Sequence, residues 1–200
     1  MPNTSNRVDG KVIRDFLSVA DLLEEPQLAQ LYAYIARKDE ATVAEVMDAL
    51  NLAQGTAYTY VNRLVDPGVL EVTSDEQPRT YATRDIGLTI TTPNDAGTYT
   101  ITAALIGAVG RRTTDEDIDT YIDRHGIAWL ATALTYAVDR ERGDVTHRTM
   151  ASDLDISPLA AEIILQALRP IVIEFYEIEQ SGASVADIQG VDQDAVRDET

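Results

Sequence analysis

The sequence contains no cysteine and only two histidines, His125 and His147, among its 200 residues. These absences exclude disulfide frameworks, cysteine-ligated zinc, iron–sulfur clusters and a cysteine nucleophile. The sequence also lacks a phosphate-binding loop, a dinucleotide-binding glycine pattern and a nucleophile elbow. We therefore expect no catalytic residue, no metal site and no cofactor.

Long apolar runs are missing as well. The longest strongly apolar stretch, residues 126–138, spans 13 residues, whereas a membrane-spanning helix needs about 20. Residues 1–10 are polar and do not resemble a secretory leader. We therefore expect a cytoplasmic protein without a membrane partner.

Positive charge is scarce, and lysine especially so. Two lysines and 14 arginines stand against 34 acidic residues, which gives a net charge of −18, and threonine occurs 21 times. Taken alone, this charge argues against a nucleic-acid partner. However, the acidic, lysine-poor composition resembles that of proteins from salt-loving archaea, and at about 1 M salt the screening length shrinks to roughly 3 Å. The net charge therefore does not exclude DNA.

Apolar spacing and breakers divide the first half of the chain into helices followed by strands. The predicted helices are residues 8–24, 28–35, 42–51 and 54–65. Thr42 and Glu45 form a capping-box pattern at the start of the third helix. Strands are predicted at 69–73 and 80–84, separated by a polar loop, and at 87–92 and 98–102. Three helices followed by a hairpin over residues 26–85 are typical of a winged helix-turn-helix.

The second half is predicted to be mostly helical, and it repeats part of the first. Helices are expected at residues 103–109, 115–125 (capped by Thr114), 127–140 and 158–168. A shift of 104 residues places Thr42, Leu50, Leu52 and Leu64 over Thr146, Leu154, Ile156 and Leu168. Residues 127–169 are therefore read as a second, degenerate helix-turn-helix-like unit. Its last helix begins with Ser157 and Pro158 and is apolar, so it is expected to pack in a dimer or inter-domain surface.

The predicted fold is mainly α with small β-hairpins (α+β): a winged helix-turn-helix followed by a helical domain containing the second unit. We expect four parts: an N-terminal helix for dimerisation or packing (1–25), the winged helix-turn-helix (26–92), the helical domain (93–179) and an acidic flexible tail (180–200).

The candidate site is the helix at 54–65. Residues 49–65 contain no acidic residue, and a helix that reads the major groove must present polar groups without acids facing phosphate. Acid-free segments can simply be buried, but this one is also polar. The candidate DNA contacts are Gln54, Thr56, Tyr58, Thr59, Tyr60, Asn62 and Arg63, together with Gln77 and Arg79 in the wing at 74–80. The helical spacing places Tyr58 on the same face as Val61 and Leu64.

Arg111–Arg112 and His147–Arg148 are weaker candidates for phosphate contacts. A place in a polar loop, without a role in binding, is the simpler interpretation of each pair.

The segments ThrValAlaGluVal, GlyThrAlaTyrThrTyrValAsnArgLeu and ProGlyValLeu occur in order within residues 26–85. They resemble archaeal winged-helix transcriptional regulators of the ArsR/TrmB-like type, and the whole chain is similar to haloarchaeal helix-turn-helix proteins. The resemblance implies a sequence-specific regulator that binds double-stranded DNA as a homodimer, with recognition residues in 54–63 and wing residues Gln77 and Arg79. The alternative is a protein–protein adaptor of the transcription apparatus built on the same scaffold. The sequence identifies no effector, whether a small molecule or a protein.

Overall fold

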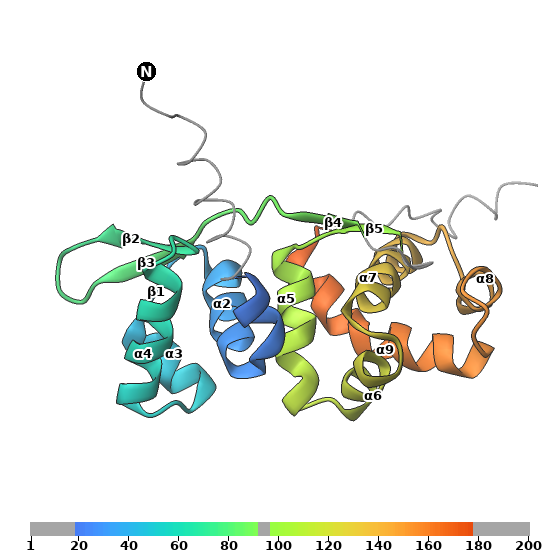
Figure 1. Ribbon diagram of the computed structural model, residues 1–200, viewed down its shortest axis with the longest axis horizontal. Helices are drawn as coiled ribbons and strands as arrows, with labels where there is room; N and C mark the ends of the chain where they lie inside the picture. Colours follow the sequence, from blue (N-terminus) through green and yellow to red (C-terminus); the bar gives the residue numbers. More distant parts are fainter. Residues whose placement is uncertain (1–18, 92–96, 178–200) are drawn as a thin grey trace, which may run out of the picture.

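The protein is elongated, with its helices arranged in a row beneath two β-hairpins (Figure 1). The computed structural model describes residues 19–91 and 97–177. Residues 19–24 are helical, and the helices that follow are α2 (Pro26–Lys38), α3 (Val43–Leu50), α4 (Gln54–Val65), α5 (Ala103–Gly110), the 3-10 helix η1 (Arg111–Thr113), α6 (Glu116–His125), α7 (Ile127–Arg142), α8 (His147–Asp153) and α9 (Pro158–Phe175). The predicted start of the first helix and the predicted tail at 180–200 lie outside the described residues.

The strands form two antiparallel sheets. β1 (Ala41–Thr42), β2 (Leu70–Ser74) and β3 (Thr80–Thr83) form one sheet in the order β1-β3-β2, and β4 (Thr89–Thr91) pairs with β5 (Thr98–Thr100) in the other. Sequence reasoning missed β1, because two residues are too few to show strand periodicity. The remaining order confirms the predicted mainly helical α+β fold, with a winged helix followed by a helical region.

Local signals set the helix-turn-helix of the first half. The capping box is present, since Glu45 N donates to Thr42 Oγ1 at 3.2 Å and Thr42 N donates to Glu45 Oε2 at 2.7 Å. Asn51 ends α3 in the left-handed conformation, with φ of 50°, which asparagine tolerates better than most residues. Leu52 N then donates to Met47 O at 3.1 Å. This turn directs the chain from α3 into α4.

The same turn occurs 104 residues later. Thr146 caps α8, Asp155 has a φ of 51°, and Ile156 N donates to Ala151 O at 3.1 Å. Helix α9 begins as predicted at Ser157 and Pro158 but continues through Pro170 to Phe175, beyond the expected end at 168. Among the described helices, none is long and apolar enough by itself to cross a membrane; α8 and α9 meet that criterion only as a pair, across a bend of 118°.

Two local expectations for the second half were wrong. Asp115, rather than Thr114, is the N-cap of α6, and its carboxylate accepts from Asp117 N and Ile118 N. A carboxylate at this position also interacts favourably with the helix dipole. The pairs Arg111–Arg112 and His147–Arg148 lie in helices rather than polar loops, in η1 and in the first turn of α8.

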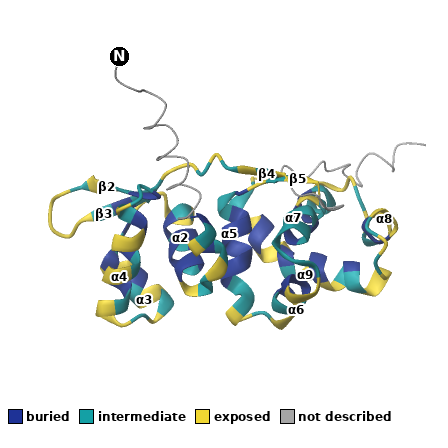
Figure 2. Cartoon of the chain, in the orientation of Figure 1, coloured by how far each residue is buried: buried dark blue, intermediate teal, exposed yellow. Residues whose placement is uncertain are grey.

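The two halves are joined by a close crossing of α2 and α5. All of α5 from Ala104 to Gly110 is buried, and Figure 2 shows it as the darkest helix at the centre of the molecule. A Cβ built on Gly110 would lie 2.9 Å from the backbone N of Gln30, and one on Gly107 would lie 2.9 Å from the Phe175 ring. The Gln30 amide donates to Gly110 O at 2.8 Å and to Thr113 Oγ1 at 2.9 Å. Glycine is therefore required where the helices meet.

Gly110→Ala is expected to destabilise the protein by about 1–3 kcal/mol, because the added methyl group meets backbone that cannot move aside. The matched control is Gly55→Ala in α4, where a Cβ meets nothing within 4 Å; it should leave stability unchanged or raise it by up to about 1 kcal/mol. Denaturant unfolding followed by circular dichroism at constant salt measures both. Equal stability of the two variants would show that the crossing is not tightly constrained.

Candidate nucleic-acid interface

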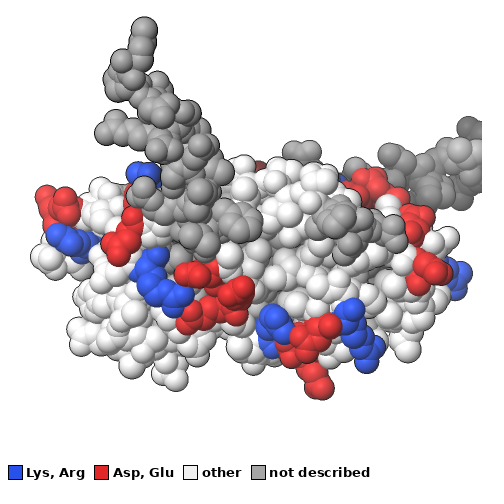
Figure 3. Space-filling model, in the orientation of Figure 1, with Lys and Arg blue, Asp and Glu red and all other residues white. Residues whose placement is uncertain are grey.

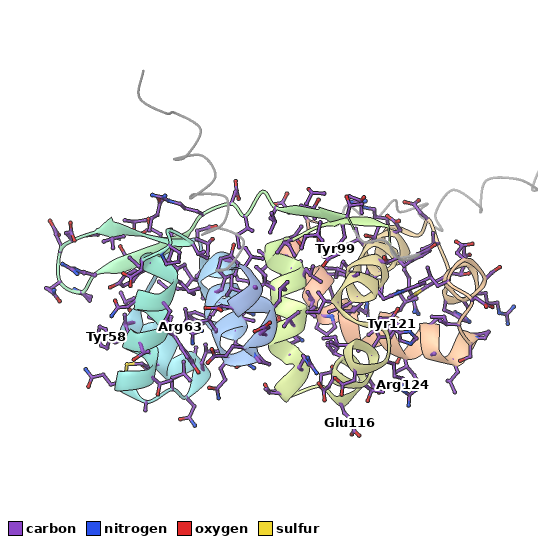
Figure 4. All side chains as sticks on the ribbon, in the orientation of Figure 1. Tyr58, Arg63, Tyr99, Glu116, Tyr121 and Arg124 are labelled. Carbon is purple, nitrogen blue, oxygen red and sulfur yellow. The ribbon has the colours of Figure 1, made fainter. Side chains whose placement is uncertain are left out.

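Helix α4 is fixed by one buried stripe. Ala57, Val61 and Leu64 are each no more than 1% exposed and pack into the core. Tyr58 is 46% exposed, so its predicted place on the buried face was wrong; Ala57 occupies that stripe instead. Figure 4 shows Tyr58 pointing away from the body of the molecule.

Helix α4 presents free polar groups at four-residue intervals along one exposed side. The side chains of Gln54, Tyr58 and Asn62 are exposed and make no hydrogen bond within the described part of the chain. Thr56 is half-buried, and the Thr59 hydroxyl donates to Gly55 O at 2.7 Å within the helix. The N-cap residue Ala53 supplies no side-chain acceptor, so the first backbone N–H groups of α4 are available to an external acceptor.

Arg63 and Tyr60 face the body of the molecule rather than the free end of α4. The Arg63 guanidinium forms ion pairs with Glu25 and Asp21 and lies 5.9 Å from the centre of the Tyr60 ring. The Tyr60 hydroxyl donates to Gln27 Oε1 at 3.1 Å. Burial alone would raise the pKa of Glu25, but the nearby Tyr60 hydroxyl and the Arg63 guanidinium outweigh it and lower the pKa. Both candidates are therefore already engaged in contacts within the protein.

The wing lies beside α4 at the same end of the molecule (Figure 1). Gln77 and Arg79 are exposed on the loop that connects β2 to β3. The Arg79 guanidinium is 3.5 Å from the Asp75 carboxylate, and Arg84 Nε is 2.7 Å from Glu71 Oε2. The wing arginines are thus paired with acids, as Arg63 is.

This pairing leaves no unpaired arginine around α4 in the described residues, while exposed acids lie nearby at Glu45, Asp48, Asp66 and Glu76. Figure 3 shows charged atoms at the wing and along the boundary between α4 and α2, whereas the surface over α3 and α4 at the lower left is uncharged. Sequence reasoning missed the partners Asp21 and Glu25, which precede Arg63 by 42 and 38 residues. No local pattern in the sequence signals a pairing over that separation.

The helix of the second unit that corresponds to α4 has a different surface. Leu159 and Ile163 occupy the exposed face of α9, where they are 69% and 39% exposed. Neither side chain provides a donor or acceptor for a base edge.

Residues 19–91 and 97–177 contain no cluster of three or more side chains suited to hold a metal ion.

Two family models match separate parts of the chain. Residues 28–86, from α2 to just beyond β3, match the model described as sugar-specific transcriptional regulator TrmB. This segment is similar to a TrmB-family winged-helix domain. The TrmB-family domain supports a role in transcriptional regulation. Residues 112–177, from η1 through α9, match a family of unknown function, DUF7437. No curated protein and no solved structure matches the chain significantly.

Replacing Glu25 by Gln is expected to lower the free energy of unfolding by up to about 1 kcal/mol near pH 7, as for an exposed ion pair. Because the folded-state pKa of Glu25 lies below its ordinary value of 4.5, the stabilisation is complete above that value and disappears as the pH falls through the folded-state pKa.

The difference between wild type and Glu25→Gln should therefore be full at neutral pH and decrease as the pH falls below 4.5. Denaturant titrations from pH 7 to 3 measure it, with the neighbouring Glu24→Gln as control, since Glu24 is exposed and makes no ion pair within the described residues. A difference that persists unchanged in acid would contradict the electrostatic explanation.

Proposed function

We propose that this protein is a sequence-specific DNA-binding transcriptional regulator in which α4 enters the major groove and the wing at 74–80 contacts the backbone or the minor groove. The observation that carries the proposal is the exposed, acid-free, unpaired polar face that runs along α4 through Gln54, Tyr58 and Asn62. Asn and Gln side chains read adenine through paired hydrogen bonds at base edges, and Gln54 and Asn62 are both exposed there. The TrmB-family match supports the same function.

The arrangement of the contact residues suits this role. Backbone N–H groups at a helix N-terminus accommodate phosphate, and Gly55 leaves open space where the DNA backbone would approach. Thr56, Tyr58 and Thr59 add hydroxyl groups, and Gln77 with Arg79 extends the contact to the wing. Tyr60 and Arg63 play a lesser part, because their present contacts must break before they bind phosphate.

The charge distribution fits DNA binding in concentrated salt. In a chain of net charge −18, pairing Arg63, Arg79 and Arg84 with acids removes local repulsion without creating a strongly basic surface. We place the protein in the cytoplasm of a salt-loving archaeon, where it acts as a homodimer on DNA sites with two-fold symmetry. An adaptor function would instead use the same face of α4 to bind a protein of the transcription apparatus.

Replacing Gln54 or Asn62 by Ala should reduce discrimination at individual base pairs by about 1–3 kcal/mol while leaving affinity for random duplex nearly unchanged. Fluorescence anisotropy on a duplex selected by the wild-type protein, and on its single-base variants, measures this effect. Thr135→Ala is the control, since Thr135 is exposed on α7 and donates only to Ala131 O of its own helix. Equal affinity of the wild type for selected and random duplexes would contradict DNA reading and favour the adaptor.

The dependence of DNA affinity on salt should be shallow or even positive. A slope of log K against log salt near −0.9 per neutralised phosphate is normal, but the arginines around α4 already have partners. Asp75→Asn releases Arg79 from its ion pair and should make the slope more negative by about 1.

DNA titrations and circular dichroism between about 0.1 and 3 M KCl measure binding and folding together. We expect the fold to be lost below a few tenths molar salt, because the self-repulsion of the acidic chain is then poorly screened. A steep negative slope for a wild-type protein that remains folded at about 0.1 M would contradict this account.

A further inference from the structure

Helix α9 carries two apolar faces, of which the structure covers one. The covered face packs into the core through Ala161, Ile164, Leu165, Leu168, Ile171 and Val172. The other face holds Leu159, Ile163 and Ile173, which are 69%, 39% and 61% exposed. A helix that is apolar on two sides is expected to have a partner on each.

The exposed face has the spacing of a coiled-coil seam. Its residues are Leu159, Ile163, Gln166, Pro170 and Ile173. They follow one another at intervals of four, three, four and three residues, the heptad spacing with which one helix packs along another. All five belong to the exposed surface of the protein. The pattern therefore indicates that a second helix lies along α9.

This seam is complementary to itself when reversed. Turned end for end about Gln166, Leu159 lies opposite Ile173, and Ile163 lies within one residue, about 1.5 Å along the helix, of the position opposite Pro170. The flanking residues Glu162 and Arg169, which carry opposite charges, then also come within one residue of facing each other. An isologous contact between two identical chains requires this self-complementarity.

A groove favours the reversed orientation. A cavity of about 770 Å³ between α7 and α9 is lined by Arg169, Pro170 and Ile173, at the C-terminal half of the seam. The most exposed apolar side chain, Leu159, projects from the N-terminal half. In an antiparallel pair, Leu159 of each copy enters the groove beside Ile173 of the other. In a parallel pair, the two grooves would face each other and the two Leu159 side chains would meet.

We propose that the exposed face of α9 is the homodimer interface and that it binds α9 of a second copy in antiparallel orientation about a two-fold axis at Gln166. Arg169, whose side chain is 62% exposed and whose Nε contacts Glu141, then flanks the seam near Glu162 of the second copy, a carboxylate that Arg140 of its own chain also binds. The proposal rests on the homodimer of the proposed function and specifies its surface. Because α9 lies in the half of the molecule away from α4 (Figure 1), the interface leaves both α4 helices free.

The test uses single-cysteine variants of the full chain without DNA, since the protein has no cysteine of its own. Under mild oxidation Gln166→Cys should form a covalent dimer, and a mixture of Leu159→Cys with Ile173→Cys should form a heterodimer. Leu159→Cys alone and the control Val72→Cys, exposed on β2, should remain unlinked. Self-linking of Leu159→Cys would overturn the antiparallel orientation, and failure of Gln166→Cys to link would overturn the two-fold axis.

Light scattering in molar salt completes the test. The wild type should have twice the chain mass, and Ile163→Glu should have the mass of one chain with unchanged helical circular dichroism. A monomeric wild type, or a dimeric Ile163→Glu, would overturn the interface. Neither measurement includes DNA. A failure of the proposed dimer interface can therefore be distinguished from a failure of the protein to recognise a DNA sequence.

Discussion

The architecture depends on the contact between α2 and α5, where side chains are small enough for two backbones to approach. Gly110 lies against Gln30, and Gly107 against Ala33 and the Phe175 ring. Glu174, next to Phe175, pairs with Arg37 of α2 and Arg111 of η1. Helix α5 lies between the two segments matched by family models and belongs to neither. It thereby fixes the TrmB-family domain to the helical half.

The acidic composition shapes the candidate interface through pairing rather than through net charge. Single exposed ion pairs contribute only about 0–1 kcal/mol each, so the pairs of Arg63, Arg79 and Arg84 matter mainly for local charge. They offset part of the negative charge of the acids that lie near α4. In the proposed DNA complex, recognition rests on hydrogen-bonding groups such as Gln54 and Asn62, whose short-range contacts are less sensitive to salt than long-range attraction.

The two helix-turn-helix-like units show how one local geometry supports different surfaces. Both have a threonine cap, a left-handed turn residue at Asn51 or Asp155 and the same backbone hydrogen bond across the turn. The helix after the first turn is polar outward, and the helix after the second is apolar outward. Function therefore follows from the exposed residues of each unit and not from the shared fold.

The sequence by itself determined the local features: the capping box at Thr42, the bounds of α4, the β2–β3 hairpin and the relation between the two units. The first three depend on residues close together in the chain, where propensity and capping act, and the relation between the units follows from comparing the sequence with itself at a shift of 104 residues. Tertiary structure decided the pairing of Arg63 with Asp21 and Glu25, the placement of β1 on β3, the exposure of Tyr58 and the face that α9 leaves open. These depend on contacts between distant segments, and the periodicity of one helix does not show which neighbour covers which face.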